Sequence, residues 1–385
     1  MRRETSGPSA STPPGLPAPL RGEGREYKAY PSLSRARWLF PAGRPGVRRA
    51  GIRGLFHPSS LKGRALRASI LAGALPGRRV SLRRDALVGL EDEFAQALYE
   101  PGVIIAFYLG VPGAYRKVTA QVMTPDGRAL AYAKIATSPA TRELIERERR
   151  ILLRLSGSEG LRGRIPEVLH AFDWEDSRVL LITGGPGWPG PKRLTSEHSE
   201  LCRDVFLPFA ELRRFDQGAM VSRMSQTLRR VGPHLPDSLS DRLEQALERV
   251  MKDLGPVWLP LSLCHRDFAP WNTRVGPRGL FVFDWDGAQE GTTPLYDLFH
   301  FRAIQAALFD LRDPLPDRSF LCRALAELWP GGNEEYLSSL YLAYLLDISL
   351  FYGEARVAAP DAGEDRVWNW FCGQVDVFLK QGPPL

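Results

Sequence analysis

The sequence predicts a bilobal α+β fold, in which a small antiparallel sheet with one main helix precedes a larger, mostly helical region. Between residues 103 and 183, short apolar segments alternate with turn residues and enclose a single helical pattern. After a Gly- and Pro-rich run at residues 184–191, apolar residues recur mainly at helical spacing, apart from a short hairpin near 273–283. Strand-like segments come first along the chain and helical spacing follows, which favours two adjoining domains.

The first 84 residues are expected to form a basic N-terminal extension. They hold 18 Lys and Arg residues but three Glu, a net charge of +15, whereas the rest of the chain carries −8. Residues 1–25 are rich in Pro, Ser and Gly, and we expect them to be disordered because they bury little apolar surface. Residues 26–84 add aromatic side chains and are expected to pack irregularly. Their arginines are either solvated or in weak contact with an anionic membrane or polymer, and no nucleic-acid module is recognisable.

The next region, residues 85–183, is expected to be the sheet-containing domain. Apolar residues at helical spacing predict a helix over 85–98, which Pro101 and Gly102 end. The elements expected after it are strands over 103–109, 117–123 and 130–135, a helix over 140–155, and strands over 165–169 and 179–183. Residues 184–385 are expected to form the helical domain.

The cysteine content and the hydropathy of the chain indicate its cellular compartment. The four cysteines form no C-x-x-C pair, so we expect free thiols in a reducing, cytoplasmic setting. No apolar run reaches the roughly 18 residues that a membrane span needs. The best run, residues 337–352, is interrupted by Ser339 and Asp347 and is expected to be a buried helix.

The strongest chemical signal is an H-x-D-x-x-x-x-N loop from His265 to Asn272, followed by Asp284-Trp285-Asp286. Apolar runs precede both motifs and are expected to be buried strands that end at a common site. Phosphoryl transfer needs a carboxylate to accept or orient a hydroxyl proton, and hard oxygen ligands for the Mg²⁺ ions that neutralise the phosphates. The two motifs supply these groups.

This pattern resembles the aminoglycoside phosphotransferase and choline kinase family, which has the protein-kinase-like fold. The resemblance implies these roles: Asp267 as catalytic base, Asn272 and Asp284 as magnesium ligands, His265 as a member of the catalytic loop, and Asp297 of a P-x-x-D-L segment as its support. For His265 we favour packing and hydrogen bonding within the loop over direct proton transfer. Asp286 is expected to be either a further metal ligand or a support of the metal site.

The resemblance also implies an ATP-binding lysine. Lys134 stands in an apolar strand, where an unpaired ammonium group would be costly, and it resembles the family's third-strand lysine that contacts the α- and β-phosphates. Its partner should be a glutamate of the following helix. Glu148 fits best, with Glu143 and Glu146 as alternatives, each of which could equally form a surface ion pair.

A loop over residues 109–117 is expected to cover the phosphates of the nucleotide. Gly110 and Gly113 are its candidate phosphate-binding residues, although it lacks the G-x-G-x-x-G of protein kinases. There is no Walker A sequence, which excludes a P-loop kinase. Residues 182–185 are expected to offer backbone groups to the adenine.

These observations predict an ATP- and Mg²⁺-dependent kinase that phosphorylates a hydroxyl of a small molecule or glycan: an aminoglycoside, a sugar, an amino alcohol or a polysaccharide intermediate. Residues 282–385 hold 16 acidic and 7 basic residues, which indicates either a solvated face or a surface for a cationic acceptor. Candidates for that surface are Glu354, Asp361, Glu364 and Asp365. The basic extension points instead to anionic material, so the two indications disagree.

Two alternatives remain. One is a non-catalytic nucleotide- or ligand-binding module on a kinase-like scaffold, although Lys134, Asp267 and Asp284 are all present. The other is a protein kinase, which is disfavoured because no A-P-E segment follows Asp284 and D-W-D replaces D-F-G.

Overall fold

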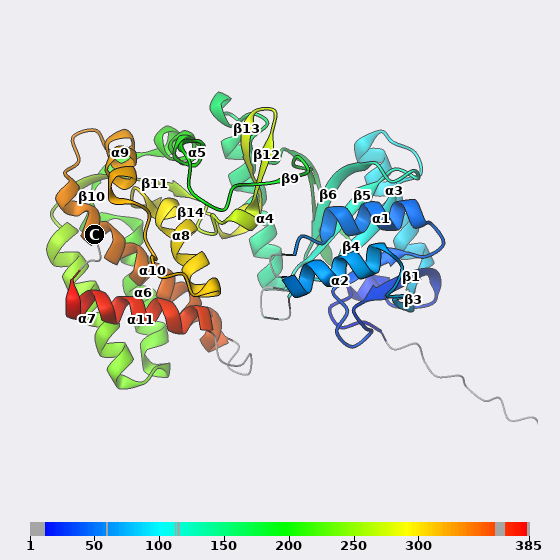
Figure 1. Ribbon diagram of the computed structural model, residues 1–385, viewed down its shortest axis with the longest axis horizontal. Coiled ribbons are helices and arrows are strands. Elements are labelled where there is room, and N and C mark those ends of the chain that lie inside the picture. The colour runs from blue at the N-terminus through cyan, green and yellow to red at the C-terminus, as the bar shows by residue number, and fades with distance from the viewer. Residues whose placement is uncertain (1–11, 59–60, 112, 114–115, 359–365, 383–385) are drawn as a thin grey trace, which may run out of the picture. The chain divides into compact units, whose positions relative to one another are not determined.

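The structure, a computed structural model, describes residues 12–58, 61–111, 113, 116–358 and 366–382 (Figure 1). The chain divides into two compact units. Unit 1 comprises residues 1–150 and 166–184, and unit 2 comprises residues 151–165 and 185–385. The division after residue 184 coincides with the start of the Gly- and Pro-rich run.

Unit 1 is built on an eight-stranded sheet in the order β3-β1-β2-β4-β5-β6-β8-β7, in which every neighbouring pair is antiparallel. The strands are β1 (Gly24–Tyr30), β2 (Trp38–Pro41), β3 (Arg78–Arg83), β4 (Ile104–Tyr108), β5 (Val118–Met123), β6 (Ala129–Ile135), β7 (Val168–Trp174) and β8 (Ser177–Thr183). The hairpin of β5 and β6 was expected. The strand expected over 165–169 instead starts at Val168, because Pro166 has no N–H to donate to a ladder.

The N-terminal extension is the main correction to the sequence prediction. Strands β1, β2 and β3 extend the sheet beyond β4, so residues 26–84 are regular structure and not an irregular cover. Leu16 and Leu20 are 2% and 0% exposed in the core of unit 1, so the disorder expected over residues 1–25 is wrong for residues 12–25. Residues 1–11 lie outside the described part. The averaged composition hid the few apolar residues that anchor the segment.

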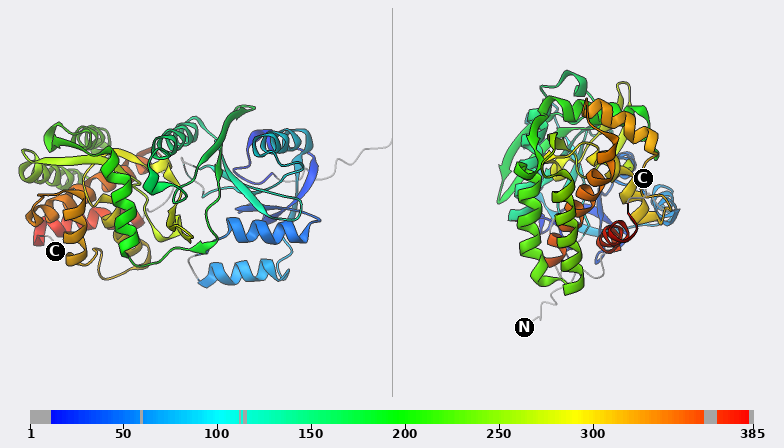
Figure 2. Two further views of the ribbon diagram at one scale, coloured as in Figure 1. Left: turned by 90° about the horizontal axis from the view of Figure 1, so that it is seen from above. Right: turned by 90° about the vertical axis from the view of Figure 1, so that its left-hand side faces the viewer.

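Helices cover both faces of this sheet. On one face α3 (Arg84–Leu98) packs Leu87, Leu90 and Phe94 into the same core as Leu20. On the other face, α1 (Pro45–Leu55) and α2 (Leu61–Leu71) enclose a second core that includes Val47. Figure 2 shows these two helices beside the sheet, opposite α3. The amphipathic pattern that predicted a helix over 85–98 is thus the pattern of a sheet-covering helix.

Truncating Leu20 should therefore weaken the whole of unit 1. We expect Leu20→Ala to lower the free energy of unfolding by about 2–5 kcal/mol, since it removes a fully buried side chain and leaves a cavity. Denaturant unfolding followed by circular dichroism measures the change. Leu61→Ala is the control, because Leu61 is 80% exposed and its loss should shift stability by less than about 0.5 kcal/mol. Equal stability of Leu20→Ala and the unchanged protein would contradict this packing.

Unit 2 is mostly helical (Figure 1). Its helices include α5 (Ser196–Phe206), α6 (Ala219–Val231), α7 (Asp237–Leu254), α8 (Tyr296–Phe309), α9 (Arg318–Leu328), α10 (Leu337–Ala358) and α11 (Arg366–Gln381), and α4 (Pro139–Leu155) begins in unit 1 and ends in unit 2. One small antiparallel sheet joins β10 (Glu211–Arg214), β11 (Trp258–Cys264) and β14 (Gln289–Thr292), and another joins β9 (Trp188–Pro189), β12 (Thr273–Gly276) and β13 (Gly279–Val282).

The predicted fold class is confirmed: an antiparallel-sheet unit is followed by a mostly helical one. The hairpin of β12 and β13 was expected, whereas β9, β10 and β14 were not, because each is only two to four residues long. Residues 337–352 lie in the buried helix α10, as predicted. Throughout the described ranges, no helix combines the length and the apolarity that a membrane crossing requires.

Candidate active site

The catalytic loop begins where β11 ends, and Asp297 holds its first turn. The backbone N–H groups of His265 and Arg266 donate to the two carboxylate oxygens of Asp297, over 2.7 and 2.9 Å. Arg266 has a left-handed backbone with φ of 68°, which a non-glycine residue adopts only when its surroundings impose it. Burial raises the pKa of Asp297, and the two backbone hydrogen bonds, which favour the charged carboxylate, oppose that rise. Asp297 thus has the supporting position that the sequence predicted.

Asp267 follows this turn and is held by Asn272. The side-chain Nδ2 of Asn272 donates to Oδ2 of Asp267 over 2.8 Å and to its carbonyl oxygen over 2.9 Å. Asn272 is buried, whereas the Asp267 side chain is 44% exposed. The loop therefore presents one anchored carboxylate that a solvent-borne molecule can reach.

His265 links this loop to the hairpin of β12 and β13. The backbone N–H of Asp267 donates to His265 Nδ1 over 3.3 Å, so the ring proton belongs on Nε2, which lies 3.0 Å from the carbonyl oxygen of Phe283. The ring also packs against Trp285, with centroids 4.5 Å apart. With both nitrogens engaged, His265 acts by packing and hydrogen bonding.

The hairpin brings Asp284 to the same end as Asn272. Thr273 pairs with Val282, and the N–H of Phe283 donates to the carbonyl oxygen of Asn272 over 3.1 Å, so Asn272 and Asp284 flank the open end of the hairpin. Asp284 has a left-handed backbone with φ of 74°, so the strand direction changes at this residue. Asp286 follows in a short 3₁₀ turn, and both carboxylates are partly exposed.

These residues suit a magnesium ion that is shared with phosphates. Over the described ranges, no three His, Cys, Asp or Glu side chains are grouped to hold a metal by themselves. Mg²⁺ commonly needs only one or two carboxylates when substrate phosphates and water complete its coordination. Because Nδ2 of Asn272 is committed to Asp267, its amide oxygen is the atom left to bind a cation. The donor chemistry fits, and the roles of Asn272, Asp284 and Asp286 as ligands stay predictions.

In unit 1, Lys134 forms an ion pair with Glu148 of α4. Both side chains are buried, 7% and 0% exposed, on the sheet face opposite the core that contains Ala133. Glu146, one of the alternatives, pairs with Arg178 instead. A buried ammonium group on a central strand is costly without such a partner. Contact of Lys134 with a nucleotide stays a prediction.

The predicted phosphate-covering loop is described only in part. Gly110 has φ of 69°, and an added Cβ would lie 2.4 Å from the carbonyl oxygen of Lys117, so glycine is required there. A Cβ added at Gly113 would meet no atom of the described residues within 4 Å. Residues 112, 114 and 115 lie outside the described residues, and the role of both glycines in binding phosphates remains an expectation.

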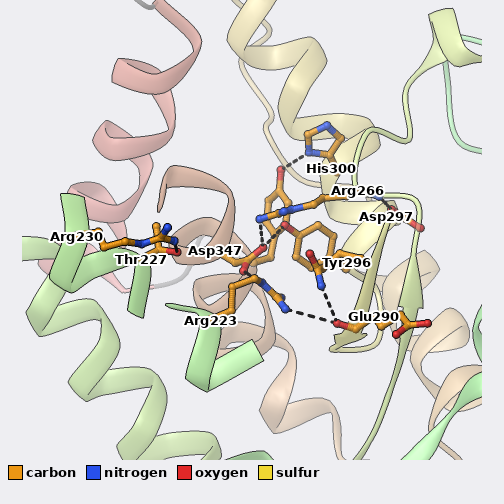
Figure 3. A network of polar contacts seen from close by, with 11 residues as sticks. Arg223, Thr227, Arg230, Arg266, Glu290, Tyr296, Asp297, His300 and Asp347 are labelled. Atoms are coloured by element: carbon orange, nitrogen blue, oxygen red, sulfur yellow. Dashed lines mark hydrogen bonds and ion pairs between the residues drawn. The ribbon is translucent and has the colours of Figure 1, made fainter. Parts of the chain in front are cut away.

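A buried charge network next to the loop was missed by the sequence analysis (Figure 3). Asp347 of α10 accepts hydrogen bonds from Arg223 Nε (3.0 Å), Arg266 Nη2 (3.0 Å) and the Tyr296 hydroxyl (2.7 Å). Burial alone would raise the pKa of Asp347, but the charges of Arg223 and Arg266 outweigh it and hold that pKa at about 2. The signal in the sequence was an acid within the apolar run of residues 337–352.

Residues 111–331 match the model of the phosphotransferase enzyme family, which covers more than half of the chain. The chain belongs to this family. Membership confirms the predicted class of enzyme, a phosphotransferase, and the predicted resemblance. By sequence, no curated protein matches this phosphotransferase.

Solved structures with the same fold are distant in sequence. A thermostable mutant of the aminoglycoside phosphotransferase APH(4)-Ia, in complex with ADP and hygromycin B, has a TM-score of 0.50 at 17% identity, covering 76% of this chain and 99% of that one. Choline kinase from Cryptosporidium parvum Iowa II has a TM-score of 0.53 at 8% identity, covering 76% and 94%. Plasmodium vivax ethanolamine kinase has a TM-score of 0.50 at 11% identity, covering 72% and 83%. These likenesses confirm the kinase-like fold of this phosphotransferase.

The acidic surface proposed for a cationic acceptor is described at one residue. Glu354 of the phosphotransferase pairs with Arg230 at 2.8 Å. Asp361, Glu364 and Asp365 lie outside the described residues. The acidic-surface prediction therefore gains nothing from Glu354, whose charge is already matched by that of Arg230.

Proposed function

We propose that this phosphotransferase moves the γ-phosphoryl group of ATP to a hydroxyl group of a small molecule or glycan. The observation that carries the proposal is the hydrogen-bonded array around Asp267. One accessible carboxylate is held by Asn272, on a loop fixed by Asp297, beside the hairpin end that carries Asp284. These are the groups that positioning a hydroxyl and neutralising phosphate charge require.

Asp267 acts as the base in this mechanism. The incoming hydroxyl donates its hydrogen bond to the Asp267 carboxylate, which orients the oxygen for attack. The carboxylate takes the proton as the new P–O bond forms and the bond from the γ-phosphorus to the bridging oxygen breaks, so that ADP leaves with that oxygen. Asn272 keeps the carboxylate in place through Oδ2. Asn272 and Asp284, with Asp286 beside them, would hold Mg²⁺, which when bound supplies positive charge to the phosphate oxygens.

Different observations support the assignment of the nucleotide and the assignment of the acceptor class. Lys134, aligned by Glu148, is the group of unit 1 assigned to the nucleotide phosphates, with the loop that contains Gly110 and Gly113 covering them. The relative crystallised with ADP and hygromycin B supports an adenine nucleotide and an alcohol-bearing small molecule. Sugars and amino alcohols are the other acceptor classes within the proposal. Weak contact of the basic surface of residues 26–84 with an anionic membrane or polymer, and a cytoplasmic location, remain predictions.

An acceptor screen with a matched metal-site variant tests the proposal. We expect nucleotide consumption that depends on both Mg²⁺ and an acceptor, in a panel of aminoglycosides, sugars and amino alcohols offered with ATP or GTP. Asp284→Asn should lose at least about 100-fold in rate, because it removes a negatively charged metal ligand that stabilises the transferring phosphoryl group. A coupled assay of ADP or GDP release measures the turnover rate of the unchanged protein and of Asp284→Asn.

The outcomes separate the alternatives. Nucleotide binding without turnover, for any acceptor and metal, would favour the non-catalytic binding module. Equal turnover by Asp284→Asn would remove that residue from the metal site. Since Asp284 is partly exposed, its amide variant should unfold at the same temperature as the unchanged protein.

A further inference from the structure

His300 lies next to the catalytic carboxylate with one ring nitrogen unaccounted for. It belongs to α8, has 0% exposure, and stacks in parallel with Phe371 of α11. Its Nδ1 is 3.2 Å from the hydroxyl oxygen of Tyr344, and its Nε2 is 3.6 Å from Oδ1 of Asp267. Within the described part of the chain, that Nε2 has no hydrogen-bond partner. A histidine that served only as packing would normally have both nitrogens satisfied.

The Tyr344 hydroxyl decides which nitrogen carries the proton. Burial raises the pKa of Tyr344 well above its ordinary value, so the hydroxyl keeps its proton. The hydroxyl can therefore donate one hydrogen bond, and His300 Nδ1, 3.2 Å away, can accept it. A ring that accepts at Nδ1 carries its own proton on Nε2. A carboxylate oxygen, Oδ1 of Asp267, lies 3.6 Å from that nitrogen.

We propose that His300 is a positioning residue for Asp267, which it holds by donating its Nε2–H to Oδ1 after Tyr344 has fixed the ring tautomer. The distance of 3.6 Å is slightly long for a hydrogen bond, and a small rotation of the half-exposed carboxylate would close it. Catalytic hydrogen bonds are often long without substrate and shorten in the complex. That His300 assists transfer rests on the proposed function of Asp267, whereas the position of the ring proton does not.

Two donors would then define the carboxylate, one on each oxygen. Asn272 Nδ2 holds Oδ2 and His300 Nε2 holds Oδ1. The terminal torsion of an aspartate is broad, so a single hydrogen bond leaves the second oxygen free to swing. Displacing a reacting group by about 1 Å can cost about 100-fold in rate. The chain Tyr344–His300–Asp267 thus fixes the orientation of the base from the buried side.

Nitrogen-15 NMR of the ring tests the tautomer without any substrate. Protein labelled at histidine nitrogens should show His300 with a protonated Nε2 and an unprotonated Nδ1. Tyr344→Phe, which removes the fixing hydroxyl, should shift the two nitrogen signals toward a mixture of tautomers. A proton found on Nδ1 in the unchanged protein, in a neutral or a doubly protonated ring, would overturn the proposal whatever the protein transfers.

Turnover of variants, with whichever acceptor is active in the screen, tests the consequence. His300→Ala should lower kcat about 10- to 100-fold while leaving the KM for ATP nearly unchanged. His300→Gln should recover most of the rate, since its amide can donate from the position of Nε2. Tyr344→Phe should lower kcat. Tyr341→Phe should not, because it removes from the same helix a buried hydroxyl that has no hydrogen-bond partner among the described residues. Equal rates for the Ala and Gln variants, or equal losses for the two Tyr variants, would reduce His300 to a packing residue.

Discussion

Asp267→Asn should lower the rate of phosphoryl transfer by about 100- to 10,000-fold, the usual contribution of a general base. An amide has nearly the shape of a carboxylate and can still accept the hydrogen bond from Asn272, but it cannot take a proton from the attacking hydroxyl. Because the Asp267 side chain is 44% exposed, the amide variant should retain the fold. Steady-state kcat with a turning-over acceptor and ATP is the measurement.

A second aspartate controls for the substitution itself. Asp216 of unit 2 accepts hydrogen bonds from Arg214 at the surface and lies in a different segment from the catalytic loop. Asp216→Asn should keep the full rate, and both variants should unfold at the temperature of the unchanged protein. Near-normal transfer by Asp267→Asn would show that the hydroxyl proton leaves by another path, and Asp267 would lose its role as the base.

The parts of the fold that the sequence predicted are those in which local pattern and tertiary packing agree. The helix over 85–98 and the hairpin of β5 and β6 bury the apolar stripe that their spacing shows. The N-terminal segment was missed because its pairing partners are distant: Tyr27 of β1 lies opposite Val80 of β3. In β1 and in the edge strand β3, charged or polar residues alternate with buried apolar ones. The average composition therefore resembles that of a solvated segment, although the alternation is that of strands.

The residues of the candidate site likewise fall into those that the sequence predicted and those that it did not. Asp267, Asn272 and Asp284 were found because one chemistry demands those residue types close together in the chain. His300 and Asp347 reach the loop from α8 and α10, through contacts over 33 and 81 residues of sequence, which no local spacing encodes. The available signal was a polar residue among apolar neighbours in a helical segment, and such a residue does not indicate its partner.

Asp347→Asn should destabilise the protein by about 3–5 kcal/mol, because it leaves the buried Arg266 and the largely buried Arg223 without their common counter-charge. Desolvating a guanidinium group is tolerable only when an anion and its hydrogen bonds compensate. Arg266 also stacks on Phe351, with its guanidinium carbon 4.3 Å from the ring centroid, so it cannot turn toward solvent without losing that contact. Denaturant unfolding measures the loss.

Asp376→Asn is the matched control for Asp347→Asn, and the pH dependence of stability is a second test of the role of Asp347. Asp376 of α11 also accepts hydrogen bonds from two cations, Arg242 (3.3 Å) and Lys380 (2.8 Å), but at the surface, so Asp376→Asn should change the free energy of unfolding far less.

The pKa of Asp347 is about 2 in the folded protein, below the ordinary 3.8. Its contribution is therefore complete above pH 4 and is lost as the pH falls toward 2. The stability difference between the unchanged protein and Asp347→Asn should shrink over that interval, and a difference that stays constant down to pH 2 would mean that Asp347 is not the charge on which Arg223 and Arg266 depend.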